Sequence, residues 1–361
     1  MGDDGWNTCK VLESFLALSA GIHTATIFKE GLEEDADFCE ALLTYGDEIA
    51  MHMDLKESYP RVLGPLVWYL APQTRALRST IAKIRDKLIP LIQARIVDKR
   101  ASLKGIENTI LDIIIDQCFR KGHLNPSRVL STDNQTARLI ADETMFLHLE
   151  AFFPIAMLAA DQIMRVMAHP EYAEPLRAEL TAAFALTGGD WSSEIWKHTP
   201  KLESFTRECL RLDTPNLFTG TRNVGNQPLN LASIGLTLNP GARVSLPSRD
   251  HHHDPEIYKD PESFDGYRFY DKVSRTTDPH GSTTISDSWI IFGLGRSVCP
   301  ARVMALRMAQ IMFSKVLLAY DIKPEAGDRC EYPSQTLMGV DAVPNTEFKM
   351  RVRPRALMAT D

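Results

Sequence analysis

Residues 292–302 read FGLGRSVCPAR, and they place one cysteine in a loop that contains two glycines. Directly after Cys299, the apolar spacing of ARVMALRMAQIMFSKVLLAY at 301–320 predicts a helix that starts beside the loop. No CxxC pair occurs in the chain, and the other cysteines are widely scattered: Cys9, Cys39, Cys118, Cys209 and Cys330. This usage predicts neither a disulfide framework nor a zinc cage, and it fits a reducing compartment.

The composition is that of a soluble globular protein. Of the 361 residues, 44% are apolar and 24% are charged, unlike disordered or collagen-like chains. The net charge of −7, without a long basic run, argues against nucleic acid as a partner. The longest apolar run, at 62–71, is about half of the roughly 20 residues that cross a bilayer, and the start MGDDGWNTCK is acidic. We therefore expect a cytoplasmic protein without a membrane anchor.

Hydrophobic periodicity predicts a mainly α fold with a minor β part. One helix face is marked by apolar residues at steps of four, three and four, namely Leu77, Ile81, Ile84 and Leu88. The segment 143–169 is apolar almost all round, which predicts a long buried central helix that contains Pro154. Alternation around the turn at 239–241 predicts a small hairpin. Because no linker composition or repeat appears, we expect a single domain over 1–361.

Four features occur in a fixed order in the second half of the chain. Glu208 and Arg211 lie three positions apart in ECLR; the segment 250–269 reads DHHHDPEIYKDPESFDGYRF and contains Arg268; the loop at 292–302 follows. This ordered set resembles the cytochrome P-450 (haem-thiolate monooxygenase) superfamily, and in particular its fungal natural-product members. The resemblance implies a cytochrome P-450-like fold.

The resemblance gives three charged residues a shared role. Glu208 and Arg211, which share a helix face, and Arg268 match the buried ion network of the family. Removing one partner from such a network leaves an uncompensated buried charge, at a cost of about 3–5 kcal/mol. We therefore expect these three side chains to have a structural role.

The loop at 292–302 keeps part of the pattern that the family uses to hold haem. The resemblance implies that Cys299 would be the ligand of haem b iron, and Phe292 and Gly295 match the first fixed positions of the loop. Ser297, however, stands where the family has Arg or His for a haem propionate. Ala301 stands where the family has a glycine, so the loop departs from the pattern at two positions.

Other parts of the resemblance depart further. Arg222 matches a propionate-binding arginine, but an alignment on HPEY puts Phe153 and Pro154 where the family has an acid and an alcohol for proton delivery. Glu150, one turn earlier, is a weak substitute. No segment matches the family's membrane anchor, first strands and first haem-binding helix, so we expect a truncated fold. We therefore expect no cofactor, a vestigial haem loop and Cys299 as a buried apolar side chain.

A pocket without haem would act by shape. We expect a haem-independent cyclase of fungal secondary metabolism that folds a terpenoid or polyene substrate for a pericyclic (Diels–Alder type) cyclisation. Pericyclases of fungal diterpenoid pathways, such as the norbornene-forming Diels–Alderase of sordaricin biosynthesis, show this chemistry. Two alternatives stay open: a haem-thiolate monooxygenase that hydroxylates a terpenoid, and a non-catalytic remnant that binds a small molecule.

The family's substrate-facing positions transfer to three segments. They are Leu149, Phe152 and Phe153 on the central helix, Leu217, Phe218 and Thr219 after the ExxR helix, and Leu337, Met338 and Val340 near the carboxyl end. His148 and Glu150 are the candidate catalytic groups, because we expect these polar side chains to point inward, where either could polarise a substrate. The run HHHD at 251–254 is not expected to bind metal, because adjacent histidines point in different directions.

Overall fold

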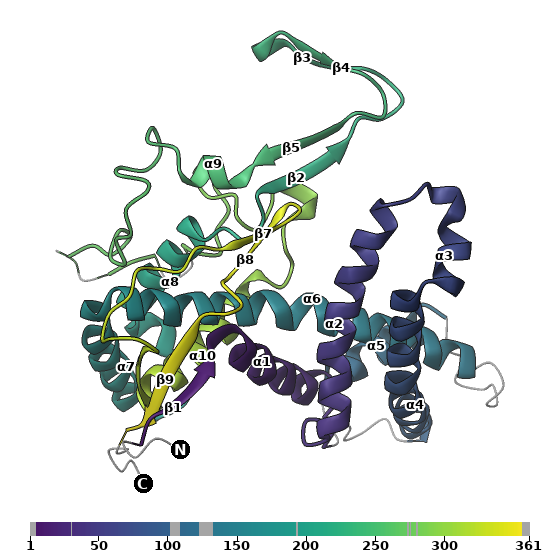
Figure 1. The fold of residues 1–361 in the computed structure, drawn as a ribbon, viewed down its shortest axis with the longest axis horizontal. Helices are drawn as coiled ribbons and strands as arrows, with labels where there is room; N and C mark the ends of the chain where they lie inside the picture. Colours follow the sequence, from purple (N-terminus) through teal and green to yellow (C-terminus); the bar gives the residue numbers. More distant parts are fainter. Residues whose placement is uncertain are drawn as a thin grey trace. The chain divides into compact units, whose positions relative to one another are not determined.

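The computed structural model describes residues 5–29, 31–101, 109–122, 133–192, 194–272, 274, 276–278 and 281–355. The chain groups into two compact units: unit 1 comprises Met1–Phe15 and Pro154–Asp361, and unit 2 comprises Leu16–Phe153. The predicted fold class is confirmed, because helices dominate and the strands form only small sheets (Figure 1). The single domain expected over 1–361 stays a prediction.

Unit 2 is built from helices. They are most of α1 (Val11–Ile27), α2 (Ala36–Glu57), α3 (Gly64–Leu70) after the short 3-10 helix η1 (Arg61–Leu63), α4 (Pro72–Ala101), α5 (Ile110–Arg120) and the first part of α6 (Asp133–Ala168). Local signals start two of them: Asp35 accepts the N–H of Phe38 at the beginning of α2, and Thr109 and Asp112 form a capping box at α5.

The core of unit 2 follows the predicted helix face. Leu77, Ile84 and Leu88 of α4 are buried, and Ile81 packs against them. Helices α2 and α4 lie side by side in Figure 1 and share this core with Phe38. The spacing of apolar residues therefore predicted which face of α4 is buried.

Unit 1 carries the sheets. Its helices are α7 (Ala173–Thr187), α8 (Pro200–Leu212), α9 (Ser248–His252) and α10 (Arg302–Ala319), with the 3-10 helices η2 (Pro170–Tyr172), η3 (Ile195–His198), η4 (Ala232–Ile234) and η5 (Gly295–Ser297). The antiparallel sheet β1-β9-β6 joins Asn7–Lys10, Lys349–Pro354 and Tyr320–Pro324. Three two-stranded pairs are β2 (Phe218–Asn223) with β5 (Arg243–Pro247), β3 (Leu229–Leu231) with β4 (Leu236–Leu238), and β7 (Thr336–Met338) with β8 (Asp341–Val343).

The hairpin predicted around 239–241 is placed differently. Strand β4 pairs with β3, and β5 pairs with β2, so the 239–241 turn connects two pairs. Gly241 has a φ of 82°, and its N–H donates to the carbonyl oxygen of Val224 at 3.0 Å. This bond returns the chain to the end of β2, which is why β5 pairs there.

The central helix α6 is long and apolar, as expected. It is the one helix of the described residues whose length and hydropathy suffice to cross a membrane, and 83% of its most apolar window is buried in the protein.

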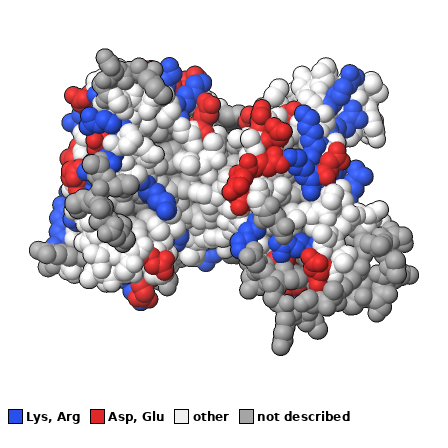
Figure 2. Space-filling model, turned by 90° about the horizontal axis from the view of Figure 1, so that it is seen from below, with Lys and Arg blue, Asp and Glu red and all other residues white. Residues whose placement is uncertain are grey.

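Charged side chains of both signs are interspersed on the face drawn in Figure 2. Neither sign covers that face.

Candidate functional site

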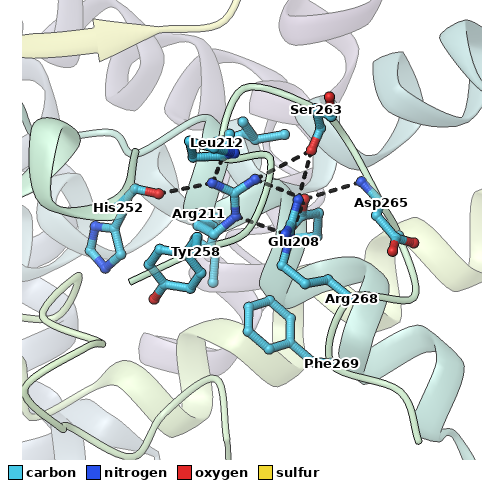
Figure 3. Close-up of polar contacts among 12 residues, drawn as sticks. Glu208, Arg211, Leu212, His252, Tyr258, Ser263, Asp265, Arg268 and Phe269 are labelled. Carbon is cyan, nitrogen blue, oxygen red and sulfur yellow. Dashed lines mark hydrogen bonds and ion pairs between the residues drawn. The ribbon is translucent and has the colours of Figure 1, made fainter. Parts of the chain in front are cut away.

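The buried ion network is centred on Glu208 of α8. Nε and Nη2 of Arg211 donate to the two carboxylate oxygens of Glu208, both at 2.9 Å (Figure 3). Nε of Arg268 reaches the same oxygens at 3.0 and 2.9 Å. The side chains of Glu208 and Arg211 are fully buried. The structure therefore brings together the three residues that the sequence placed in one network.

The remaining donors of this network hold the segment 250–269 against α8. Nη1 of Arg211 donates to the carbonyl oxygens of His252 and Pro261 at 2.8 and 2.7 Å. Nη2 of Arg268 donates to the carbonyl oxygen of Ser263 at 2.9 Å. The network contains two cations, Arg211 and Arg268, but one anion, Glu208. The carbonyl dipoles are therefore needed to stabilise the second cation.

The cysteine loop has a backbone that only glycine permits at two points. Gly293 has a φ of 83°, and a Cβ on it would lie 2.9 Å from the carbonyl oxygen of Ser297. Gly295 has a φ of 59°. The N–H of Cys299 donates to the carbonyl oxygen of Phe292 at 2.8 Å, which closes the loop. The position of the thiol is therefore set by backbone geometry.

Two arginines hold the loop from either side. Nη1 of Arg302 donates to the carbonyl oxygen of Cys299 at 2.9 Å, and Nε donates to the carbonyl oxygen of Thr283 at 2.9 Å. Arg222 of β2 donates from Nη2 to the carbonyl oxygen of Leu294 at 2.9 Å, and its side chain is exposed beside the loop. Sequence reasoning missed Arg302, although its place at the start of α10 was visible.

The beginning of the loop is anchored in an apolar cluster. Phe292 packs against a cluster of buried residues from different elements of unit 1, namely Leu210, Trp289, Ile291 and Leu306, with Leu158 and Phe269 at its edge. Through Phe292, the loop therefore packs against a cluster to which α6, α8 and α10 all contribute side chains. Cys299 itself is a partly buried free cysteine, whereas a buried apolar side chain was expected.

Six of the nine predicted pocket residues lie in two segments that contact each other. The N–H of Leu217 donates to the carbonyl oxygen of Val340 at 2.8 Å, and the N–H of Ala342 donates to that of Pro215 at 2.7 Å. Phe218, Leu337 and Val340 are 49%, 59% and 57% exposed, while Leu217 and Thr219 are partly buried. Met338 lies in β7. These two segments, joined by backbone hydrogen bonds, expose apolar side chains in unit 1.

The other three predicted pocket residues lie in unit 2. Phe152 is buried, and a Cβ on Gly46 of α2 would lie 3.2 Å from Leu149 and 3.7 Å from Phe152. Phe153 is partly buried, with its ring 6.3 Å from that of Phe152. Leu149 and Phe152 thus fill the close approach of α2 to α6.

The two candidate catalytic groups differ in their surroundings. Burial, together with the nearby His23, lowers the pKa of His148 to about 4, so its imidazole is neutral at pH 7. Its Nε2 lies 3.3 Å from Oγ1 of Thr24 and 3.4 Å from the carbonyl oxygen of Ala20. Glu150 is exposed. The structure does not bring His148 and Glu150 to a common point, because they are two positions apart on one helix.

The histidines of the run 251–254 have separate partners. Nδ1 of His252 lies 2.8 Å from the carbonyl oxygen of Ser248, whereas Nδ1 of His253 lies 3.0 Å from Glu262. Within the described part of the chain, no group of three or more His, Cys, Asp or Glu side chains is arranged to hold a metal ion.

Comparison with known proteins decides the family. The cytochrome P-450 family model matches residues 5–350. This chain belongs to the cytochrome P-450 family. Cytochrome P-450 monooxygenase cpsD of Aspergillus campestris is 36% identical over 89% of this chain and 58% of that protein. Bicoumarin synthase ktnC of Aspergillus niger is 36% identical over 97% of this chain and 83% of that protein, and bicoumarin synthase desC of Aspergillus desertorum is 34% identical over 96% and 66%.

The expectation that this cytochrome P-450 binds no cofactor is wrong. The family match and the names of the relatives point to haem. The expectation gave too much weight to the side chains of Ser297 and Ala301. The loop conformation depends instead on glycine and on the bond from Cys299 to Phe292. Replacement of the family's residues by Ser297 and Ala301 leaves that backbone conformation in place.

The residues around the loop fit haem. A cysteine thiolate is the axial ligand that this chemistry requires, and Cys299 is a free, partly exposed thiol on a closed loop. The exposed guanidinium of Arg222 beside the loop suits a carboxylate such as a propionate. The relatives are named as a cytochrome P-450 monooxygenase and as bicoumarin synthases, and none is named as a cyclase, so haem-independent cyclisation has less support than the monooxygenase alternative.

Proposed function

We propose that this chain is a haem-thiolate oxidase of fungal secondary metabolism, in which the Cys299 thiolate would hold the haem iron. The observation that carries the proposal is the closed glycine loop, in which the N–H of Cys299 bonds to Phe292. When bound, haem supplies the activation of oxygen. In a hydroxylation, one oxygen atom enters a C–H bond of the substrate, and two protons and two electrons convert the other to water.

The residues of the chain have distinct tasks in this proposal. Cys299 would hold the iron, and the loop backbone fixes where its sulfur lies. Arg222 would bind a propionate, and Phe292 joins the loop to the apolar core. Ser297 cannot supply the second cation that the family has at its position, so Arg222 carries more of this interaction.

The substrate in this proposal is an apolar small molecule. Phe218, Leu337 and Val340 present half-exposed apolar surface on the joined segments of unit 1, and Thr219 is the polar group among them. A mostly apolar lining with few polar groups is typical of sites for such ligands. That Leu149, Phe152 and Phe153 of unit 2 face substrate stays a prediction from the family resemblance.

A second candidate reaction is the oxidative coupling of two aromatic monomers. Two relatives that align with 97% and 96% of this chain are named bicoumarin synthases. In such a coupling, two C–H bonds break, one C–C bond forms, and two protons and two electrons are released. Together with two electrons from the electron donor and two further protons, they reduce one molecule of oxygen to two of water. Phe153 and Pro154 carry no group that holds or transfers a proton. A phenolic monomer has an ionisable hydroxyl of its own. Its reaction therefore depends less on a proton-transferring side chain from helix α6.

One incubation separates the two reactions. The purified haem-loaded chain is incubated with 7-hydroxycoumarin, an electron donor and oxygen, and the products are analysed by mass spectrometry. Hydroxylation gives a monomer with one added oxygen atom, whereas coupling gives a dimer that lacks two hydrogens. Turnover that continues without oxygen and electron donor would contradict both candidates.

A further inference from the structure

A buried polar cluster joins three parts of unit 1. Nε and Nη2 of Arg165 on α6 donate to the carboxylate of Asp213 at 2.8 and 2.7 Å. The hydroxyl of Tyr332 donates to Oδ1 of Asp161 at 2.8 Å, and the guanidinium of Arg165 lies 3.4 Å from the centre of the Tyr332 ring. We call these four residues the Asp161 cluster. Its aspartates and Arg165 are buried.

The Asp161 cluster lies at the roots of both joined pocket segments. Asp213 follows α8 directly and stands two residues before Pro215, where the first segment begins. Tyr332 stands four residues before β7, which carries the second segment. Nε2 of Gln335 donates to the carbonyl oxygen of Asp213 at 3.3 Å, so the two roots also contact each other.

Beyond these roots, the segments are tied to one another by backbone. Leu217 and Ala342 donate to Val340 and Pro215, and Asn216 forms a β-bridge with Asp341. The Tyr332 side chain is held against α6 by its hydrogen bond to Asp161 and by the Arg165 guanidinium over its ring. A shift of Tyr332 would therefore displace 336–341 and, through the backbone bonds, 215–219.

The charges of the Asp161 cluster explain why the tyrosine is needed. Asp213 accepts hydrogen bonds from Nε and Nη2 of Arg165, whereas Asp161 accepts its hydrogen bond from Tyr332. Burial, reinforced by the charge of Asp213, raises the pKa of Asp161 well above its usual value. Asp161 thus retains its proton to a higher pH than a solvated aspartate does. The hydroxyl of Tyr332 satisfies an oxygen that would otherwise lack a partner.

We propose that Asp161 and Tyr332 are positioning residues that set where the segments 215–219 and 336–341 meet the substrate. The part of this inference that concerns substrate rests on the proposed function. The part that concerns the two segments rests on the hydrogen bonds alone. Neither residue is placed in contact with substrate or haem.

Amide hydrogen exchange tests the structural part. In Tyr332→Phe, peptides that cover 215–219 and 336–343 should exchange faster than in the unaltered chain. Tyr267→Phe is the matched control, because the Tyr267 hydroxyl is buried without a hydrogen-bond partner in the described structure. Unchanged exchange of both peptides in Tyr332→Phe would overturn the proposal.

A second pair of variants covers the case in which Tyr332→Phe does not fold. Asp161→Asn keeps an uncharged acceptor for the tyrosine and should exchange like the unaltered chain, whereas Asp161→Ala should exchange faster in the same peptides. Equal exchange in Asp161→Asn and Asp161→Ala would overturn the role of this side chain. The exchange of each variant is measured at the same interval below its own melting temperature. A general loss of stability is thereby separated from a local effect on the two segments.

Binding of 7-hydroxycoumarin tests the substrate part. The affinity of Tyr332→Phe should be about two- to tenfold weaker, which corresponds to the loss of one hydrogen bond, and Asp161→Asn should restore it relative to Asp161→Ala. Faster exchange with unchanged affinity would overturn the link to substrate. An unaltered chain that binds no 7-hydroxycoumarin would contradict the coupling of aromatic monomers as its reaction, and the exchange result would then decide the positioning by itself.

Discussion

The N–H of Cys299 donates to the carbonyl oxygen of Phe292 at 2.8 Å, across a loop in which Gly293 has a φ of 83°. The thiol is therefore carried by a closed backbone, and neighbouring side chains can change without moving it. This relationship explains how the loop tolerates Ser297 and Ala301 where the family has other residues. It also indicates which substitution should damage the site most.

Gly293→Ala should weaken haem binding without a change of any haem ligand. A Cβ at this position meets the carbonyl oxygen of Ser297 at 2.9 Å in a backbone conformation that disfavours side chains, at a cost of about 1–3 kcal/mol. The measurement is the ratio of haem to protein after purification, together with the melting temperature. Gly225→Ala is the control, because nothing lies within 4 Å of its Cβ position. Equal haem content in both variants would show that the loop backbone does not control binding.

Arg268→Ala should destabilise unit 1 severely. Glu208 is fully buried, and the loss of Arg268 removes one of its two cations, at a cost of about 3–5 kcal/mol. Urea denaturation measures the free energy of unfolding. Arg353→Ala provides the comparison, since its pair with Asp321 is partly exposed and worth under about 1 kcal/mol. Similar losses in the two variants would contradict a structural role for the Glu208 network.

His148 should make the stability of the protein fall in mild acid. Its pKa is lowered from 6.5 to about 4 in the folded chain, so the folded state resists protonation that the unfolded state accepts. The contribution of His148 is present above pH 6.5 and is lost as the pH falls towards 4, by about 3 kcal/mol in total.

The measurement is the free energy of unfolding between pH 7.5 and 4 for the unaltered chain and for His148→Gln. The variant should show a shallower decline, because glutamine does not titrate. Identical declines would mean that His148 is solvated or charged in the folded state.

The sequence predicted what depends on local spacing or on an ordered set of motifs. Residues at i and i+3, such as Glu208 and Arg211, lie on the same face of any helix, so their contact could be predicted. The family resemblance supplied Arg268 as their partner from a distant part of the sequence. The loop around Cys299 was found in the same way. The cofactor prediction failed because side chains were compared position by position, whereas the conformation of the loop depends on its glycines.

The candidate catalytic groups show where sequence reasoning reaches its limit. Helix α6 is apolar almost all round, so its pattern did not reveal that His148 is buried and Glu150 is exposed. The Asp161 cluster was missed because Asp213 and Tyr332 are distant in sequence from α6. A signal was present, since Asp161 and Arg165 are a charged i, i+4 pair in an apolar segment.

The most direct test of the haem-thiolate account is the absorption spectrum of the purified chain, reduced and exposed to carbon monoxide. The account predicts a Soret band that carbon monoxide shifts to the position of thiolate-bound iron, and loss of that shift in Cys299→Ser. A colourless chain, or a carbon monoxide spectrum that Cys299→Ser leaves unchanged, would contradict it.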